Sequence, residues 1–409
     1  MKGLTLLISL YLVCSSSVYG DKNLALDEYI SQNKQHQFKY DYTKNKAQYK
    51  LLRDSWIAPL NLSYSYIRSN PSDDVQTNQS AAIKMDQPIF QSGGIYFGIK
   101  YANALKKYSD FSVDMAKRKI TKATISLLMQ IKKTELNIKR QKLQIRNADI
   151  NLIQKKEQYL NGQLDSGFLD KAIIERNSVI QRLYDIQTAK ERLVTNFATF
   201  SDLNYADAKI PHLELLTKKE FLNHNVALKI SKSSIEKERY SKYMTYSKYL
   251  PRVSLIAGYN WNKSENVFVQ VANQKVDSSS EVDYYNYGFR ISMPININTF
   301  DDIEQSRVVY LKSKLQENEQ KVQVAALFEQ VIQNIQNLEQ KKVLSLENIE
   351  LYSKLLEDTK VLHQAGYKTS YDVELLQNSA DISQLDAKIF EIDKQLELLN
   401  LYEMYIDEI

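Results

Sequence analysis

Four stretches of the chain alternate between apolar and polar residues, and they fall into two pairs. Residues 59–69 and 81–91 form the first pair, and residues 251–262 and 282–294 form the second. A period of two is typical of a β-strand with one apolar face and one polar face. Each stretch is about ten residues long, which is enough to cross a bilayer as a tilted strand of a membrane β-barrel.

The apolar face of these strands is the one that we expect to contact lipid. It carries leucine, valine, isoleucine and aromatic side chains at alternate positions. The residues assigned to this lipid face are Leu60, Leu62, Tyr64, Tyr66, Val253, Leu255, Tyr259, Trp261, Tyr285, Tyr287, Phe289 and Ile291. A single soluble strand would show the same alternation, so the interpretation depends on the pairing and order of the four.

A long stretch with helical periodicity follows each strand pair. Residues 95–200 and 302–405 place apolar side chains at intervals of three and four, separated mainly by lysine, glutamine and asparagine. Gly162 and Gly366 interrupt these stretches, so each is predicted to form a helical hairpin with a turn at its tip. A first helix of roughly 65 residues would be about 95 Å long.

The two halves of the chain repeat this plan. We predict a first repeat over residues 21–205 that begins with an N-terminal helix, a linker over residues 206–217, and a second repeat over residues 218–409. The second repeat begins with a helix over residues 218–248, and a longer polar loop over residues 262–281 joins its strands. The fold class is therefore mainly α, with a membrane β component of four strands per chain.

Residues 1–20 have the pattern of a secretory signal peptide. An apolar run follows a lysine, small residues precede Asp21, and cleavage is expected after Gly20. Cys14 is the only cysteine, so the mature chain would have no disulfide. Lipidation of Cys14 is the alternative, although Val13 fits poorly as the residue before a lipidated cysteine.

Composition excludes several classes of protein. The mean hydropathy of −0.44 excludes a membrane protein made of many helical spans. The net charge of +5 is small for 409 residues, and no block of basic residues suggests nucleic-acid binding. The four histidines lie far apart, and no nucleophile elbow, phosphate loop or zinc spacing occurs. We therefore expect no enzyme, no cofactor and no metal site.

Four strands are too few to close a membrane barrel. Strand edges in lipid cannot leave their N–H and C=O groups unpaired, and the smallest membrane barrels have about eight strands. Several chains must therefore share one barrel, and three chains would give twelve strands. The alternative is a periplasmic or surface structural protein built on antiparallel coiled coils, without a pore.

Four segments of the mature chain carry recognisable motifs: YLPRVSLIAGYNW (249–261), MDQPIFQSGG (85–94), ISMPININTF (291–300) and AGYKTSYDVELLQNSA (365–380). The last of them forms the second tip and contains Gly366, Asp372 and Val373 in a Gly-x5-Asp-Val pattern. Taken together, in this order and spacing, these motifs resemble those of the TolC family of outer-membrane efflux proteins.

The resemblance implies a homotrimer with a twelve-stranded β-barrel in the outer membrane and an α-helical tunnel through the periplasm. The implied partners are a periplasmic adaptor, also called a membrane fusion protein, and an inner-membrane pump of the RND, ABC or MFS class. The implied function is a passive exit duct for efflux or type I secretion. The tip turns at Gly162, Gly167 and Gly366 would contact the adaptor.

The resemblance also implies a periplasmic gate at the helical tips. Asp372 takes the place of an acidic ring in the second tip, and Lys368 matches a basic residue that ties neighbouring helices together. His363 replaces an aromatic residue, and Leu375 stands where the family often has a second acidic ring. In the first tip we choose Asp170 as the acidic residue.

The choice of Asp170 allows for a two-residue insertion after Gly162, and Asp165 is the second candidate. Three copies of Asp372 at a constriction should bind multivalent cations, and their mutual repulsion should raise the carboxylate pKa. The alternative for Asp372 is a charge that complements the helix dipole. The alternative for Lys368 is an ordinary solvated lysine in the turn, without a role in a gate.

Overall fold

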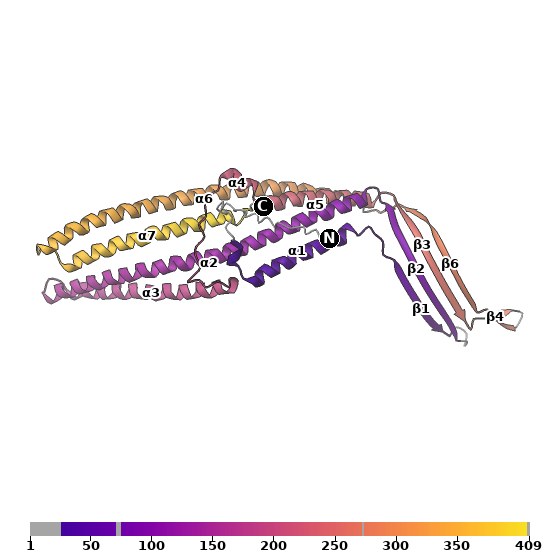
Figure 1. Cartoon of the computed structure of the whole chain (residues 1–409), viewed down its shortest axis with the longest axis horizontal. Helices are drawn as coiled ribbons and strands as arrows, with labels where there is room; N and C mark the ends of the chain where they lie inside the picture. Colours follow the sequence, from indigo (N-terminus) through magenta and orange to yellow (C-terminus); the bar gives the residue numbers. More distant parts are fainter. Residues whose placement is uncertain (1–25, 71–74, 272–273, 407–409) are drawn as a thin grey trace, which may run out of the picture.

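The computed structural model describes residues 26–70, 75–271 and 274–406. The expected signal peptide over residues 1–20, which includes Cys14, lies outside these ranges. Long helices make up most of the molecule, and one small sheet projects from their end (Figure 1). No helix in the described ranges is both long and apolar enough to cross a membrane.

The helices form two long hairpins and three shorter elements (Figure 1). After a short 3-10 turn (Leu26–Tyr29), they are α1 (Gln32–Arg53), α2 (Gly94–Leu160), α3 (Ser166–Phe200), α4 (Lys218–Asn223), α5 (Val226–Lys248), α6 (Thr299–Gln364) and α7 (Ser370–Tyr402). The hairpins are α2–α3 and α6–α7. The 67 residues of α2 correspond to a rod of about 100 Å.

Four strands form one antiparallel sheet in the order β1-β2-β3-β6. Their bounds are β1 (Asn61–Ser69), β2 (Gln76–Phe90), β3 (Arg252–Glu265) and β6 (Ser280–Ser292). The strand pairs of the two repeats meet where β2 pairs with β3, so β1 and β6 are the edges. The mainly α fold with four strands that form the main sheet is therefore confirmed.

The prediction of a polar loop over residues 262–281 is wrong. β3 and β6 continue into this region, and a second hairpin joins β4 (Phe268–Val271) to β5 (Gln274–Asp277). Valines at alternate positions explain the difference, since Val269 lies opposite Val276 in this two-stranded ribbon.

The prediction of a single helix over residues 218–248 is also wrong, because the segment forms two helices, α4 and α5. Asn225 interrupts it, because its side chain accepts a hydrogen bond from Leu228 N (3.1 Å) and so caps the start of α5. Asn225 also bridges to Tyr405, and Val226 N donates to Met404 O at 2.8 Å. The C-terminal segment therefore fixes the break between α4 and α5.

α2 is the central helix of the bundle. Near the sheet it packs against α1 and α5, and toward the tips it packs against α3 and α7. α6 packs against α5 near the sheet and against α7 toward the tips. One lateral edge of the helical bundle is consequently formed by α6, and the other by α1 and α3.

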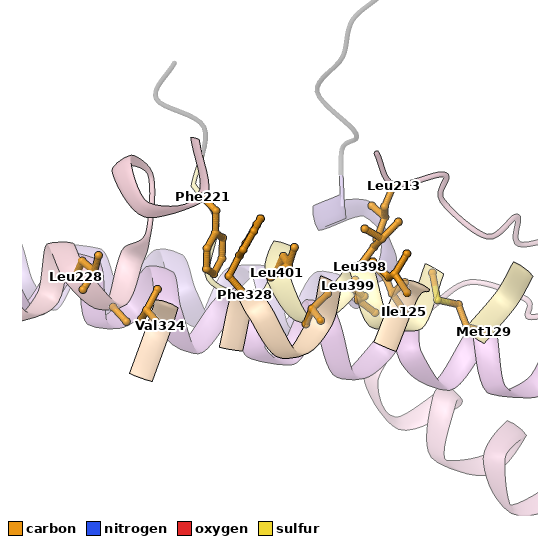
Figure 2. Packing of buried hydrophobic residues seen from close by; sticks show 13 residues of the cluster. Ile125, Met129, Leu213, Phe221, Leu228, Val324, Phe328, Leu398, Leu399 and Leu401 are labelled. Atoms are coloured by element: carbon orange, nitrogen blue, oxygen red, sulfur yellow. The ribbon is translucent and has the colours of Figure 1, made fainter. Parts of the chain in front are cut away.

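The apolar core lies at the middle of the bundle, where α2, α4, α5, α6 and α7 meet. Figure 2 shows side chains from α2, α4, α6 and α7 converging there. The rings of Phe221 and Phe328 are 5.7 Å apart, and Phe221 is fully buried. The segment expected to be a linker contributes Leu213, which is buried and donates its N–H to Gln395 Oε1 at 2.7 Å. This segment therefore packs as part of the core.

Candidate functional site

The lipid face assigned from the sequence is one continuous face of the sheet. The pairing places Tyr64 opposite Ala81, Ala81 opposite Trp261, and Tyr259 opposite Tyr285. Residues that lie directly opposite each other in a ladder share a face. By this register and the alternation along each strand, all twelve assigned residues share it.

This face is apolar and uncovered. Leu62 is 77% exposed and Tyr287 is 79% exposed, and their neighbours on the face include Leu60, Phe289 and Ile291, which are also exposed. A contiguous apolar surface of this kind marks an interaction with lipid or with another protein. Its contact with lipid stays a prediction.

The opposite face of the sheet is polar. Asp86 and Arg290 form an ion pair at 2.9 Å across β3, and Asn260 donates to Asn286 Oδ1 at 3.2 Å. Gly258 gives room for this amide, since a Cβ atom there would lie 2.8 Å from Asn286 Oδ1. The sheet therefore has the two-faced character that a barrel strand needs, with apolar and polar sides.

Both helical tips end in the same turn. Gly162 N donates to Tyr159 O at 2.9 Å, and Gly366 N donates to His363 O at 3.0 Å. Each is followed by a bond from the next N–H to the carbonyl five residues before it, which completes a Schellman motif. Both glycines have positive φ, 70° and 82°, so any other residue would be strained there.

Asp372 caps the start of α7. Its Oδ2 accepts hydrogen bonds from Thr369 N (2.9 Å) and Thr369 Oγ1 (2.8 Å), while Asp372 N donates to Thr369 Oγ1 (3.2 Å). This is a capping box. The pKa of Asp372 is lowered, mainly by the hydrogen bond from the Thr369 backbone. A ring of three carboxylates is expected to raise this pKa, so the shift in the single chain has the opposite direction.

His363 and Lys368 lie on the two sides of the same turn. His363 Nδ1 is 2.9 Å from Lys368 O, so the imidazole ties the end of α6 to the turn. The Lys368 side chain is exposed. The structure thus brings Asp372, Lys368 and His363 together, as proposed for the gate, although their role in gating stays a prediction.

The two-residue insertion assumed for the first tip is wrong. Asp165 caps α3 three residues after Gly162, just as Thr369 caps α7 three residues after Gly366. The position equivalent to Asp372 is consequently Phe168. Asp170 is exposed and lies in α3, so it loses the equivalence on which its gate assignment depended.

Gly167 lies in the first turn of α3, and its N–H donates to Asp165 Oδ1 at 2.8 Å. The second candidate for the first tip, Asp165, is therefore engaged as a helix cap.

Sequence reasoning missed a series of polar contacts between α2 and α7. In order toward the tips, the ion pairs are Lys122–Glu403 (2.7 Å), Lys133–Asp393 (2.6 Å), Arg140–Asp386 (2.7 Å) and Arg146–Glu374. Every basic member comes from α2 and every acidic member from the α7 side. We call this series the α2–α7 seam. It joins the two hairpins along most of the length of α7.

The pair of the α2–α7 seam that lies nearest the tips, Arg146–Glu374, has two hydrogen bonds. Both Arg146 nitrogens Nε and Nη2 bond the Glu374 carboxylate, the second at 2.9 Å, and this hydrogen bonding lowers the Glu374 pKa. No sequence signal marks these pairs, because the partners are more than 200 residues apart. In the described ranges, no cluster of three or more histidine, cysteine, aspartate or glutamate residues could hold a metal ion.

No protein-family model and no curated sequence matches the chain. Solved structures do. The outer membrane protein VceC of Vibrio cholerae has a TM-score of 0.71 at 16% identity, covering 93% of this chain and 96% of that one. The CmeC outer membrane channel of Campylobacter jejuni has a TM-score of 0.70 at 12% identity, covering 94% and 86%.

The MtrE outer membrane channel of Neisseria gonorrhoeae has a TM-score of 0.64 at 12% identity, and the match covers 93% of this chain and 86% of that one. The matches extend over the sheet and the helical hairpins alike, because they cover more than nine tenths of the chain. The chain therefore has the fold of the outer-membrane channels of the TolC family.

Proposed function

We propose that this chain is the outer-membrane exit duct of a tripartite efflux or type I secretion system and that it works as a homotrimer. The observation that carries the proposal is the open four-stranded sheet with one exposed apolar face. Such a sheet is unstable alone in water or in lipid, because its edges and its apolar face both need partners.

The sheet has the right polarity to close with copies of itself. The four strands alternate in direction, so β6 of one copy can pair antiparallel with β1 of the next. Two copies would give eight strands, a number at which side chains fill the barrel interior. Three copies give twelve strands and leave a lumen, as a duct requires.

The helical edges support the same assembly. Exposed apolar residues follow α6 at a spacing of seven, at Leu315 and Val322 and again at Leu344 and Leu351. The other edge exposes apolar side chains of α1 and α3, including Ile174. A spacing of seven is typical of a seam that packs against another helix. In a trimer, α6 would meet α1 and α3 of the neighbouring copy.

The tips are suited to an adaptor. Tyr367 is 81% exposed beside Gly366, and Leu160 and Phe168 are exposed around Gly162. These apolar side chains on rigid turns would contact a periplasmic adaptor, and through it an inner-membrane pump. The duct itself would be passive, with Asp372 and Lys368 at its periplasmic entrance.

Disulfide cross-linking tests the trimer. With Cys14 replaced by serine, Tyr64→Cys on β1 is combined in turn with Tyr285→Cys, Tyr287→Cys and Phe289→Cys on β6. We expect one register to give cross-linked dimers and trimers from outer-membrane fractions.

The matched control is the pair Ala82→Cys and Asn260→Cys, which lie opposite each other on the inner strands β2 and β3. This pair should cross-link only within one chain. A monomer in the soluble periplasmic fraction, with no cross-link between β1 and β6 of different copies, would show a structural protein without a pore.

A further inference from the structure

A groove between α2 and α5 gathers cationic side chains around an apolar floor. Its volume is about 510 Å³. Phe111 and Ile235 supply the floor, and the cationic residues around it are Lys107, Lys229, Lys232 and Arg239. We call this the α2–α5 groove.

The α2–α5 groove has an excess of positive charge. Among the described residues that line it, the one carboxylate is that of Glu236, which lies 3.6 Å from the Arg239 guanidinium. In the described part of the chain, Lys107 and Lys232 have no hydrogen-bond or ion-pair partner. Both are exposed at the mouth of the groove. Convergent charges of one sign beside an apolar wall raise the local concentration of the opposite ion.

Three nearby carboxylates of α2 and α5 are held by other partners. Asp110 pairs with Lys106 at 2.5 Å, Asp114 accepts a hydrogen bond from Tyr42, and Glu238 pairs with Lys237 at 2.9 Å. α5 as a whole carries six basic and two acidic residues. Among the described residues, Lys107 and Lys232 are therefore the lysines of the groove whose charge no carboxylate offsets.

The apolar floor favours an organic anion over an inorganic one. From Lys229 to Arg239 the groove follows ten residues of α5, a length of about 15 Å. That is long enough for an aromatic or short alkyl body to cover Phe111 and Ile235 while its acid group meets the lysines. Burial of apolar surface adds about 25 cal/mol per Å² to such a contact, which an inorganic ion cannot make.

We propose that the α2–α5 groove binds a small organic anion with an apolar body, such as an aryl sulfonate or aryl carboxylate. α2 and α5 are the inner helices of the layer near the sheet, flanked by α1 and α6. A neighbouring copy at either edge would consequently leave the groove open. The occupant would be a dissolved molecule and not another chain.

A membrane lipid is a poor occupant, and this step rests on the proposed function. Arg239 lies nine residues before Lys248, where α5 ends below the sheet, a distance of about 14 Å. The headgroup region on one side of a bilayer is only about 5–8 Å thick. If the sheet spans the membrane, the groove lies in the aqueous phase beyond the headgroups.

Isothermal titration calorimetry with naphthalene-1-sulfonate tests the proposal on the full chain in nanodiscs of phosphatidylcholine. We expect one site per chain, weakened by added salt because the contact is electrostatic. The double variant Lys107→Gln/Lys232→Gln should weaken binding about tenfold or more. The matched control is Lys156→Gln/Lys171→Gln near the first tip, which removes the same charge and should change nothing.

Two further compounds test the cationic side chains and the apolar floor separately. Naphthalene-1-sulfonamide is neutral and keeps only the apolar body, whereas inorganic sulfate keeps only the charge. Both should bind at least tenfold more weakly than the sulfonate. Equal binding of sulfate, equal weakening by the control variant, or no site at all would overturn the proposal. Binding is measured without conduction, so the absence of a binding site in the groove leaves the duct proposal intact. A chain that does not cross-link and stays soluble is titrated in buffer without nanodiscs, so the two proposals fail separately.

Discussion

Arg146 of α2 and Glu374 of α7 form a two-pronged ion pair that joins the two helical hairpins close to their tips. It is the last of the pairs in the α2–α7 seam. Beyond it toward the tips, the described residues include no further ion pair between α2 and α7. Under the proposed function, opening of the duct at the tips would have to break this pair.

Replacing Glu374 by glutamine should loosen the tips. The variant removes the charge-assisted bonds to Arg146, so we expect faster amide hydrogen exchange over residues 365–372 without a change in the core. Acid should act in the same direction. Because the folded pKa of Glu374 is lowered, its stabilising contribution is present above the unfolded value of about 4.3 and is lost as pH falls through the folded value.

The control for this change is Glu357→Gln, which removes an exposed carboxylate from α6 that has no partner among the described residues. The swapped pair Arg146→Glu/Glu374→Arg should restore slow exchange. If the swap stays as loose as Glu374→Gln, the pair does not hold the hairpins together.

Leu62 and Ser63 give a matched test of the two faces of the sheet. They are neighbours on β1, but Leu62 lies on the lipid face and Ser63 on the polar face. Leu62→Arg should cost about 2–4 kcal/mol in the membrane if the residue lies near the bilayer midplane, and Ser63→Arg much less. Outer-membrane yield and the proportion of detergent-resistant oligomer should fall for Leu62→Arg alone. Equal losses would contradict the assigned faces.

Local patterns in the sequence predict most of the helices and strands and which strand residues share one face of the sheet. The reason is that a helical or strand periodicity is visible within a few consecutive residues. The alternation at Tyr285, Tyr287 and Phe289 already specifies which side chains share a face. The glycines at the tips are equally local signals. Their positive φ values follow from the turn itself.

What escaped prediction depends on residues that are distant in the sequence. Asn225 breaks a helical pattern because the chain near Tyr405 pairs with it. The α2–α7 seam and the α2–α5 groove likewise require knowledge of which helices pack together. At the first tip, the expected acidic residue, Asp170, is not the equivalent of Asp372. Only the structure shows that both turns have the same length and that Phe168 is the equivalent residue.

Phe221→Ala should release α4 from the bundle. Phe221 is fully buried against Phe328, and truncation of such a side chain costs about 3–5 kcal/mol. α4 has only six residues, so we expect local exchange over residues 213–225 to rise while the hairpin tips stay unchanged. Leu203→Ala, at a residue that is 42% exposed, is the control. Unchanged exchange in Phe221→Ala would show that α4 is held by its other contacts.

The pH dependence of cation binding at Asp372 separates its two possible roles. In the single chain, the capping bonds from Thr369 lower its pKa, so the carboxylate stays ionised until pH falls below the unfolded value of about 3.9. Three such carboxylates brought together in a narrow pore would repel each other and gain protons at higher pH. We expect the capping bonds to dominate, because they remain intact in each copy.

Block of the channel by hexamminecobalt(III) in planar bilayers measures this titration. Block should persist from pH 7 to below the unfolded pKa of about 3.9 and then disappear, and Asp372→Asn should weaken it at every pH above that value. Thr369→Ala should move the midpoint upward, toward the unfolded value, and shorten α7 at a cost of about 1 kcal/mol. Asp358→Asn removes an exposed charge from α6 and should leave the block unchanged. A midpoint well above pH 4.5 in the unmodified protein would mean that repulsion within a ring outweighs the cap.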